Sequence, residues 1–440
     1  MNKRVLPRLA IVLAAGCIQA WAQDPAVQAE LASQQARIAQ LEKQFAAKPD
    51  SGPFKFPQEL TPYIVVEATL VSTSNNTAAG QNKIDLPTQP WFSSNRWGLR
   101  GTLNTCSSDV DLIYKLETGF GIADGGLQTT NVETAASPAG TTPTNAGTEA
   151  VLFNRDAWLG FTSKTIGQVT IGRQNTLARD FSETYGDAFG TAGVGYEEIG
   201  WTNQNNFKDL VNLAGSVDGS RMNKGIVWKK LTEAGVSMGL AYNFADDTLV
   251  TPYANNVTQA NTSTRDTTGC AALGFNAKAF NVSGYYTLAN QAGFTQKSYS
   301  AGGDITPTTA IKVNAGYFRY TADQGPVNGQ RTDTAYVASA SYTASEFWSY
   351  FLGYQAWQAK NAGLSKGFMT MPFANGASAT TVGTGNRNTT YLAVRRMLNK
   401  RADVYFAADY EQLTNGYKLA ATNGFHQQTE YAIGLRIKAL

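Results

Sequence analysis

Histidine, cysteine and charged residues are all scarce in this chain. Of its 440 residues, one is histidine (His426), three are cysteine and 16% are charged. A single histidine cannot form a histidine metal cluster, and its position near the start of the last predicted strand argues against a histidine-based catalytic triad. The net charge of +3 equals the contribution of Lys3, Arg4 and Arg8, so the chain after residue 22 is close to neutral. This balance argues against a nucleic-acid-binding protein, and we expect no cofactor.

Long apolar runs are also absent. Beyond the N-terminal region, no stretch reaches the roughly 18 apolar residues that a membrane-spanning helix requires. Transmembrane strands carry a much weaker signal, however, because only every second residue has to be apolar. The absence therefore excludes membrane helices and leaves a membrane β-barrel open.

The N-terminus has the features of an export signal. Three basic residues precede the apolar run Leu9–Ile18, and Ala20-Trp21-Ala22 forms a cleavage site, so residues 1–22 are predicted to be a signal peptide. A lipoprotein signal ending at Cys17 is the alternative. Cys106 and Cys270 would remain after cleavage. We expect them to be unbonded, because the strand layout below puts them toward opposite ends of the structure.

A heptad pattern follows the cleavage site. Val27, Leu31, Gln34, Ile38, Leu41 and Phe45 occupy its a and d positions, and a Pro- and Gly-containing cluster ends it. We therefore predict an oligomeric coiled-coil stem over residues 23–48 and a linker over residues 49–59. A single amphipathic helix lying on the domain is the alternative.

From residue 60 onward, apolar and polar residues alternate in segments of strand length. In one of them Leu240, Tyr242 and Phe244 lie on one face and Ala241 and Asn243 on the other. Sixteen segments are predicted: 60–73, 95–105, 108–123, 150–163, 167–175, 219–231, 235–245, 266–279, 281–291, 296–306, 309–322, 331–344, 347–360, 386–398, 401–414 and 426–440.

The connections between these segments alternate between short turns and long loops. An even number of strands with this pattern is typical of an antiparallel transmembrane β-barrel closed over residues 60–440. Closure leaves no sheet edge exposed to lipid. The expected fold class is thus all-β, a 16-stranded antiparallel transmembrane β-barrel with a short N-terminal α-helical coiled-coil segment. The longest connection, residues 176–218, is the third long loop.

Several motifs, in order along the chain, resemble the trimeric general porins of Gram-negative outer membranes, especially the betaproteobacterial type. They are Thr61–Glu67, Ser94–Gly101, Leu116–Phe120, Leu152–Gly160, Gly167–Gln174, Leu398–Arg401 and Gly434–Arg436. The resemblance implies a homotrimer in the outer membrane, in contact with lipid and lipopolysaccharide, whose third loop folds into the pore. The predicted stem is similar to the periplasmic coiled coil of DcaP-like channels. The chain ends in Leu440 where the family generally ends in Phe.

A basic wall is predicted inside this barrel. Strand alternation places Arg96 and Arg100, and likewise Arg221, on faces opposite to apolar residues, and the family resemblance adds Arg155 and Arg173. Acids of the third loop, Asp180, Glu183 and Asp187, would oppose them across the opening. An alternative is that these acids pair with neighbouring cations to hold the loop. Lys115 shares a face with Glu117 and is expected to pair with it.

Five arginines against three acids predict a mild preference for anions. The expected function is passive diffusion of small hydrophilic solutes and ions through a water-filled pore. The alternative is a channel selective for small anionic metabolites such as dicarboxylates. An enzyme is not expected, and residues 23–59 are too few for the plug of an energy-coupled receptor.

Overall fold

The computed structural model describes residues 59–75, 79–87, 90–93, 95–127, 152–183, 185, 221–244, 267–291, 294–323, 329–362, 383–415 and 425–439. The predicted signal peptide, the coiled-coil stem and nearly all of the linker lie outside these residues. All described residues belong to one compact unit, Pro57–Leu440. In the part of the chain that the structure describes, no helix is both long enough and apolar enough to span a membrane.

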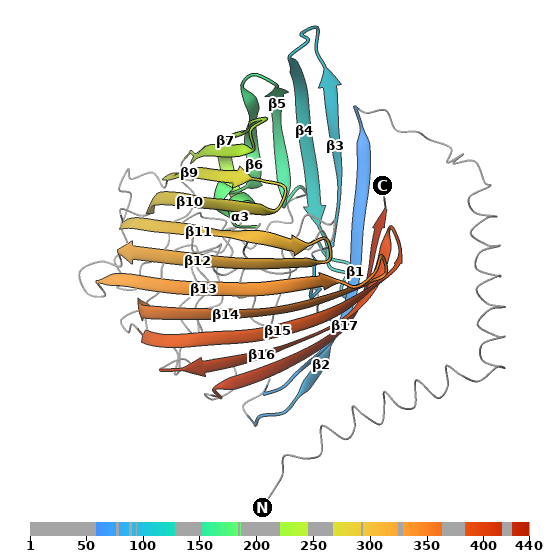
Figure 1. Ribbon diagram of the computed structural model, residues 1–440, viewed down its shortest axis with the longest axis vertical. Coiled ribbons are helices and arrows are strands. Elements are labelled where there is room, and N and C mark those ends of the chain that lie inside the picture. The colour runs from blue at the N-terminus through green and yellow to red at the C-terminus, as the bar shows by residue number, and fades with distance from the viewer. Residues whose placement is uncertain are drawn as a thin grey trace, which may run out of the picture. The chain divides into compact units, whose positions relative to one another are not determined.

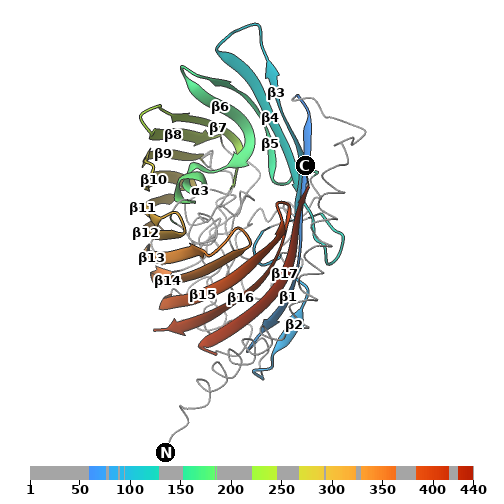
Figure 2. The ribbon, with the colours of Figure 1, turned by 45° about the vertical axis from the view of Figure 1, so that its right-hand side comes forward.

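Sixteen of the described strands form a single closed, antiparallel sheet (Figures 1 and 2). They are β1 (Thr61–Thr73), β3 (Arg96–Asn104), β4 (Val110–Gly119), β5 (Asp156–Ser163), β6 (Gly167–Asn175), β7 (Arg221–Leu231), β8 (Val236–Asn243), β9 (Thr267–Asn276), β10 (Phe280–Gln291), β11 (Phe294–Thr308), β12 (Ile311–Asp323), β13 (Gln330–Thr343), β14 (Trp348–Ala362), β15 (Gly383–Asn399), β16 (Ala402–Thr414) and β17 (Gln427–Ala439). The predicted barrel is confirmed.

The first strand closes the barrel. β1 pairs with β17 from Ile64↔Ala439 to Thr73↔Glu430, and with β3 from Thr61↔Arg100 to Val65↔Arg96. Closure gives the backbone groups of both terminal strands a partner, which a lipid environment requires.

Three details differ from the sequence prediction. A short additional strand, β2 (Lys83–Asp85), lies inside the predicted connection 74–94 and pairs with the C-terminal end of β1, from Val71 to Thr73. It is too short to show any alternation, which is why no pattern identified it. The strands predicted over residues 108–123 and 150–163 are shorter, at Val110–Gly119 and Asp156–Ser163.

The two faces of the barrel wall have the expected character. On β8, Leu240 and Tyr242 are exposed on the outer face, whereas Ala241 and Asn243 are buried on the inner face. On β14, Tyr350, Leu352 and Tyr354 are exposed while Phe351 and Gln355 are buried. Large apolar side chains thus project outward, as lipid contact requires, and smaller or polar side chains line the interior.

One helix, α3 (Leu177–Ser182), lies against the inner wall at the start of the third long loop (Figure 2). The Thr176 side chain caps it by accepting a hydrogen bond from the Arg179 amide. Leu177, Ala178 and Phe181 pack against inner-face residues of β7 to β10, namely Met222, Val227, Ala241, Cys270, Ala272 and Tyr285.

Gly239 on β8 makes this close approach possible. A Cβ atom at that position would lie 2.9 Å from Leu177 Cδ2 and 3.1 Å from Phe181 Cε2. A side chain there would press on the ends of the Leu177 and Phe181 side chains, so the glycine allows α3 to pack this close to the wall.

Candidate functional site

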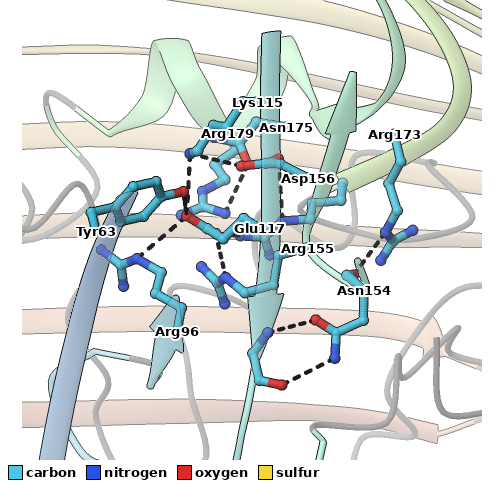
Figure 3. A network of polar contacts seen from close by, with 12 residues as sticks. Tyr63, Arg96, Lys115, Glu117, Asn154, Arg155, Asp156, Arg173, Asn175 and Arg179 are labelled. Carbon is cyan, nitrogen blue, oxygen red and sulfur yellow. Dashed lines mark hydrogen bonds and ion pairs between the residues drawn. The ribbon is translucent and has the colours of Figure 1, made fainter. Parts of the chain in front are cut away.

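Four cationic side chains converge on the buried carboxylate of Glu117 on β4. Figure 3 shows three of them, Arg96, Lys115 and Arg155. Arg155 Nε lies 2.5 Å from Oε1, Lys115 Nζ 3.3 Å from Oε2, Arg96 Nε 3.6 Å from Oε2, and Arg221 Nη2 4.0 Å from Oε1. The Tyr63 hydroxyl donates a hydrogen bond to Oε2 at 2.6 Å. Glu117 and these four cations, with Asp156, are named the basic cluster below.

Asp156 is the second carboxylate of the basic cluster. Lys115 Nζ lies 2.8 Å from Asp156 Oδ2, and Arg221 Nε lies 3.9 Å from Oδ1. Lys115 thus bridges the two acids, which confirms its expected pairing with Glu117. With four cations against two carboxylates, the basic cluster carries an excess of two positive charges.

Strand register brings the members of the cluster together. Glu117 on β4 pairs with Asp156 on β5, and Lys115 pairs with Arg100 on β3. Because paired residues present their side chains on the same face, these four side chains share the inner wall. The same register places Trp158, opposite Lys115, on the inner face and Phe161, opposite Leu112, on the outer face. Alternation in the sequence left this strand ambiguous, because two large apolar residues three positions apart cannot share a face.

Arg155 is fixed just before β5 begins. Its backbone amide donates to the Glu117 carbonyl at 3.1 Å, while its side chain reaches the Glu117 carboxylate. The preceding residue, Asn154, is bound to Gly119 at the end of β4 by two hydrogen bonds. Its side-chain oxygen accepts from the Gly119 backbone amide at 2.7 Å, and its side-chain nitrogen donates to the Gly119 carbonyl at 3.3 Å. These backbone contacts position the arginine with little freedom.

The structure places the other two predicted arginines beside the cluster rather than in it. The Arg100 guanidinium lies over the Tyr63 ring at 5.5 Å from its centroid. Arg173 donates to the Asn154 carbonyl at 2.7 Å and to Asn223 Oδ1 at 2.6 Å (Figure 3). A bulge between Gly172 and Gln174 interrupts the β6–β7 register at this point. Simple alternation therefore fails there.

Of the three predicted acids, Asp180 is the one with well-defined contacts. It lies on α3, accepts from Lys229 Nζ at 2.8 Å, and accepts from Asn175 Nδ2 at 3.1 Å. Burial raises the pKa of this carboxyl, but the Lys229 ammonium, the Arg179 charge and the Asn175 hydrogen bond together outweigh burial and hold the pKa below its usual value. Glu183 forms the C-terminal cap of α3, and Asp187 lies outside the described residues.

Sequence reasoning missed a second group of arginines on the inner wall, from β13 to β17. Each pairs with a wall carboxylate: Arg331 with Asp333 at 2.6 Å, Arg387 with Glu411 at 3.2 Å, and Arg436 with Asp403 at 3.0 Å. Arg331 and Asp333 are two residues apart on one strand, and this spacing was a visible signal. The other pairs join different strands, so only register reveals them.

Known proteins share sequence features and the fold with this chain. A model of the Gram-negative porin family matches residues 45–416. An outer membrane porin protein of Bordetella pertussis is 27% identical over 106 residues, which is 23% of this chain. The chain thus matches 22% of the length of that curated relative.

Two solved structures share the fold. An anion-selective porin from Comamonas acidovorans aligns with a TM-score of 0.61 and 16% identity, over 87% of this chain and 99% of that one. The outer membrane channel DcaP of Acinetobacter baumannii aligns with a TM-score of 0.53 and 12% identity, over 88% and 99%. The family match covers most of the sequence and identifies an outer-membrane channel protein rather than an enzyme. The chain belongs to the Gram-negative porin family.

Proposed function

We propose that this protein forms a water-filled channel for passive diffusion of small hydrophilic solutes and ions, with a mild preference for anions. The observation that carries the proposal is the basic cluster, where four cations meet two carboxylates on the inner face of β3 to β5 and at the start of β7. In a confined pore, an excess of fixed positive charge raises the local concentration of anions and lowers that of cations.

Two members of the basic cluster are the most accessible to solutes. The side chain of Lys115 is 19% exposed and that of Arg221 is 12% exposed, compared with 5% for Arg96 and 7% for Arg155. We therefore assign the direct contact with passing anions to Lys115 and Arg221. Arg96 and Arg155 contribute to the field and hold Glu117.

Reversal potentials in planar bilayers under a salt gradient test this function. The wild-type protein is expected to prefer anions, and Lys115→Gln and Arg221→Gln should each lower the anion-to-cation permeability ratio by about twofold. Arg396→Ala is the matched control, because Arg396 lies over the Trp348 ring on the outer face and should leave the ratio unchanged. Clear cation selectivity of the wild-type channel would refute the proposed preference.

A channel selective for small dianions such as dicarboxylates is the second candidate. It is favoured by the convergence of four cations on one point, since a dianion could contact several of them at once. Saturable block of the conductance by a dicarboxylate would support this candidate. Conductance that rises linearly with salt, without block, would support the general pore.

We further propose that the protein assembles as a homotrimer through the outer face of β4 to β6. The exposed apolar side chains there include Leu112, Leu159 and Ile171, which are aliphatic. On β13 and β14, by contrast, the exposed side chains include Tyr336, Tyr342, Tyr350 and Tyr354. Aromatic residues form girdles where a barrel meets the membrane interfaces, so we assign the tyrosine-bearing face of β13 and β14 to lipid and the aliphatic face of β4 to β6 to the neighbouring subunit.

A further inference from the structure

The residues immediately before β3 lie buried inside the barrel. Trp91 and Phe92 are 5% and 3% exposed, and Ser93 and Asn95 are fully buried. These four residues, named the inner segment below, end the first long connection. No motif in the sequence indicated that they have a role in the pore.

The carboxylate of Glu67 on β1 binds the inner segment. Oε1 accepts from the Phe92 amide at 2.8 Å and from the Tyr405 hydroxyl at 2.5 Å. Oε2 accepts from the Ser93 amide at 2.8 Å and from the Ser93 hydroxyl at 2.7 Å. Glu67 is itself fully buried. Donors thus occupy both oxygens, as a buried carboxylate requires.

Further contacts fix the ends of the segment. The Trp91 amide donates to the Thr69 hydroxyl at 3.2 Å, and Asn95 accepts from the Glu67 amide through its side chain. The Asn95 carbonyl also accepts from the Phe120 amide at 3.1 Å, beyond the end of β4. The segment is therefore bonded to β1 at one end and to the β4 side of the wall at the other.

Aromatic side chains of the barrel wall pack against the inner segment. Trp91 and Phe92 pack with Phe351, Tyr391 and Tyr405 and with smaller residues of β1 and β15 to β17. The Phe92 and Tyr405 rings lie 4.1 Å apart, and Tyr405 lies flat on Gly434, where a Cβ would come within 2.2 Å of the ring. The Arg436 guanidinium lies over the Phe92 ring, 5.2 Å from its centroid.

All of these partners are on the inner face of the wall. Glu67, Thr69 and Val71 are buried on the inner face of β1, whereas Leu70, between Thr69 and Val71, is 54% exposed on the outer face. The inner segment thus covers the arc from β14 through β17 to β1. Helix α3 covers a different arc, from β7 to β11, and the basic cluster lies on β3 to β5 and at the start of β7.

We propose that the inner segment is a second constriction element of the channel and that Glu67 is the residue that positions it. On this proposal, which rests on the proposed channel function, the opening is narrowed from two sides, by α3 and by the inner segment. The inner segment also leads directly into Arg96 and so sets the position of that member of the basic cluster. Solute size is limited by the first loop as well as by the third.

The substitution Glu67→Gln tests the positioning role, because it removes an acceptor for the hydrogen bonds that hold the inner segment. Five groups donate to the carboxylate: the Phe92 and Ser93 backbone amides and the hydroxyls of Ser93, Tyr405 and, at 3.3 Å, Thr69. A glutamine replaces one acceptor oxygen with a donor nitrogen, from which the hydroxyls can accept but a backbone amide cannot. Whichever way the glutamine amide is oriented, its nitrogen faces the backbone amide of Phe92 or that of Ser93, so one of the two backbone contacts that hold the segment is lost. The segment should loosen while the wall, whose strands are joined by backbone bonds, remains closed.

The experiment measures single-channel conductance of the full-length protein and the largest polyethylene glycol that enters the pore. Glu67→Gln and the double variant Trp91→Ala/Phe92→Ala should each raise conductance by about 1.5-fold or more and admit larger polymers. Glu411→Gln is the charge-matched control, since Glu411 is also a fully buried wall carboxylate but holds Arg387 instead. It should change ion selectivity and leave the polymer cut-off as it is.

Three results would overturn the inference. One is an unchanged conductance and cut-off in the double variant, which leaves Glu67 in place and so separates the segment's role from any folding defect of Glu67→Gln. Another is an equal widening by Glu411→Gln, which would assign the effect to charge. A wild-type protein that folds but forms no channel would refute the proposed function together with this inference.

Discussion

Glu117 is an acid at the centre of a basic site, and its role follows from that position. Without it, four cations would lie close together in a partly buried place, where like charges repel strongly. The carboxylate allows them to be concentrated at one point while the cluster keeps a positive excess. Tyr63 adds a neutral donor to the same carboxylate. Selectivity and stability thus depend on the same side chain.

Glu117→Gln should therefore change two properties in opposite directions. Removal of one partner from a buried ion pair lowers the free energy of unfolding by about 3–5 kcal/mol, so the barrel should unfold at a lower temperature. Among channels that still fold, anion preference should increase, because the excess positive charge rises from two to three. Gel mobility after graded heating and reversal potentials measure the two effects.

Glu233→Gln is the control for this change. Glu233 lies exposed in the turn between β7 and β8, and its substitution should affect neither property. A Glu117→Gln channel with wild-type selectivity would show that the basic cluster does not set the field that ions encounter.

Helix α3 is held to the wall by a few specific contacts. Lys229 binds Asp180, the Ser283 hydroxyl donates to the Phe181 carbonyl at 2.7 Å, and Tyr185 donates to the Ser300 hydroxyl at 2.8 Å. Because the pKa of Asp180 lies below its usual value, the ion pair persists at neutral pH and is lost only as the pH falls through that lowered pKa.

Gly239→Val should displace α3, since its side chain would overlap Leu177 and Phe181. Cys270 lies in the apolar cluster beneath the helix and is 8% exposed, so displacement should make it react faster with a water-soluble maleimide. The experiment is done in a Cys106→Ser background, because Cys106 is exposed. The rate of labelling, followed by mass spectrometry, should rise by about tenfold or more as burial is lost.

Gly269→Val provides the matched glycine substitution. Gly269 precedes Cys270 on β9, and a Cβ there meets no atom within 4 Å, so the added side chain should leave α3 in place. Slow labelling of Cys270 in both variants would mean that α3 does not depend on the close approach at Gly239.

Element boundaries were predictable wherever alternation was regular. β6 (Gly167–Asn175) matches its predicted range, and β16 and β17 each begin within a residue of theirs. Alternation failed at the bulge beside Arg173 and said nothing of β2, which is three residues long. The inner segment was also invisible, because its role depends on Glu67 and Tyr405, which meet only after closure brings β1 beside β17 and β16.

The candidate site was predictable in part for the same reason. Arg96 and Arg221 were identified by alternation and Arg155 by family resemblance, and the structure brings all three to Glu117. Asp156 was missed because the alternation of its strand was ambiguous. The assignment of the third-loop acids to the pore stays a prediction, since the structure describes only the first part of that loop.

At the scale of the whole molecule, subunit contact and lipid contact make different demands on the outer wall. Leu159→Trp should therefore disrupt the trimer, because a larger ring at a packed interface overlaps the neighbouring subunit. Size-exclusion chromatography with light scattering in detergent should then detect monomers.

Leu352→Trp should leave the trimer intact, since Leu352 lies between Tyr350 and Tyr354 on a surface assigned to lipid. Trimers in both variants would place the subunit contact elsewhere on the barrel.

The pairing of Ile64 with Ala439 has a consequence for how the protein reaches its folded state. Neighbouring hairpins can form as each new strand follows the last, but this ladder joins strands from opposite ends of the chain. Contacts so distant in sequence carry a large entropic penalty and form slowly. Until β17 arrives, β1 presents open backbone groups along its length, which invite pairing with other chains. The period before closure is thus when this barrel is most vulnerable to aggregation.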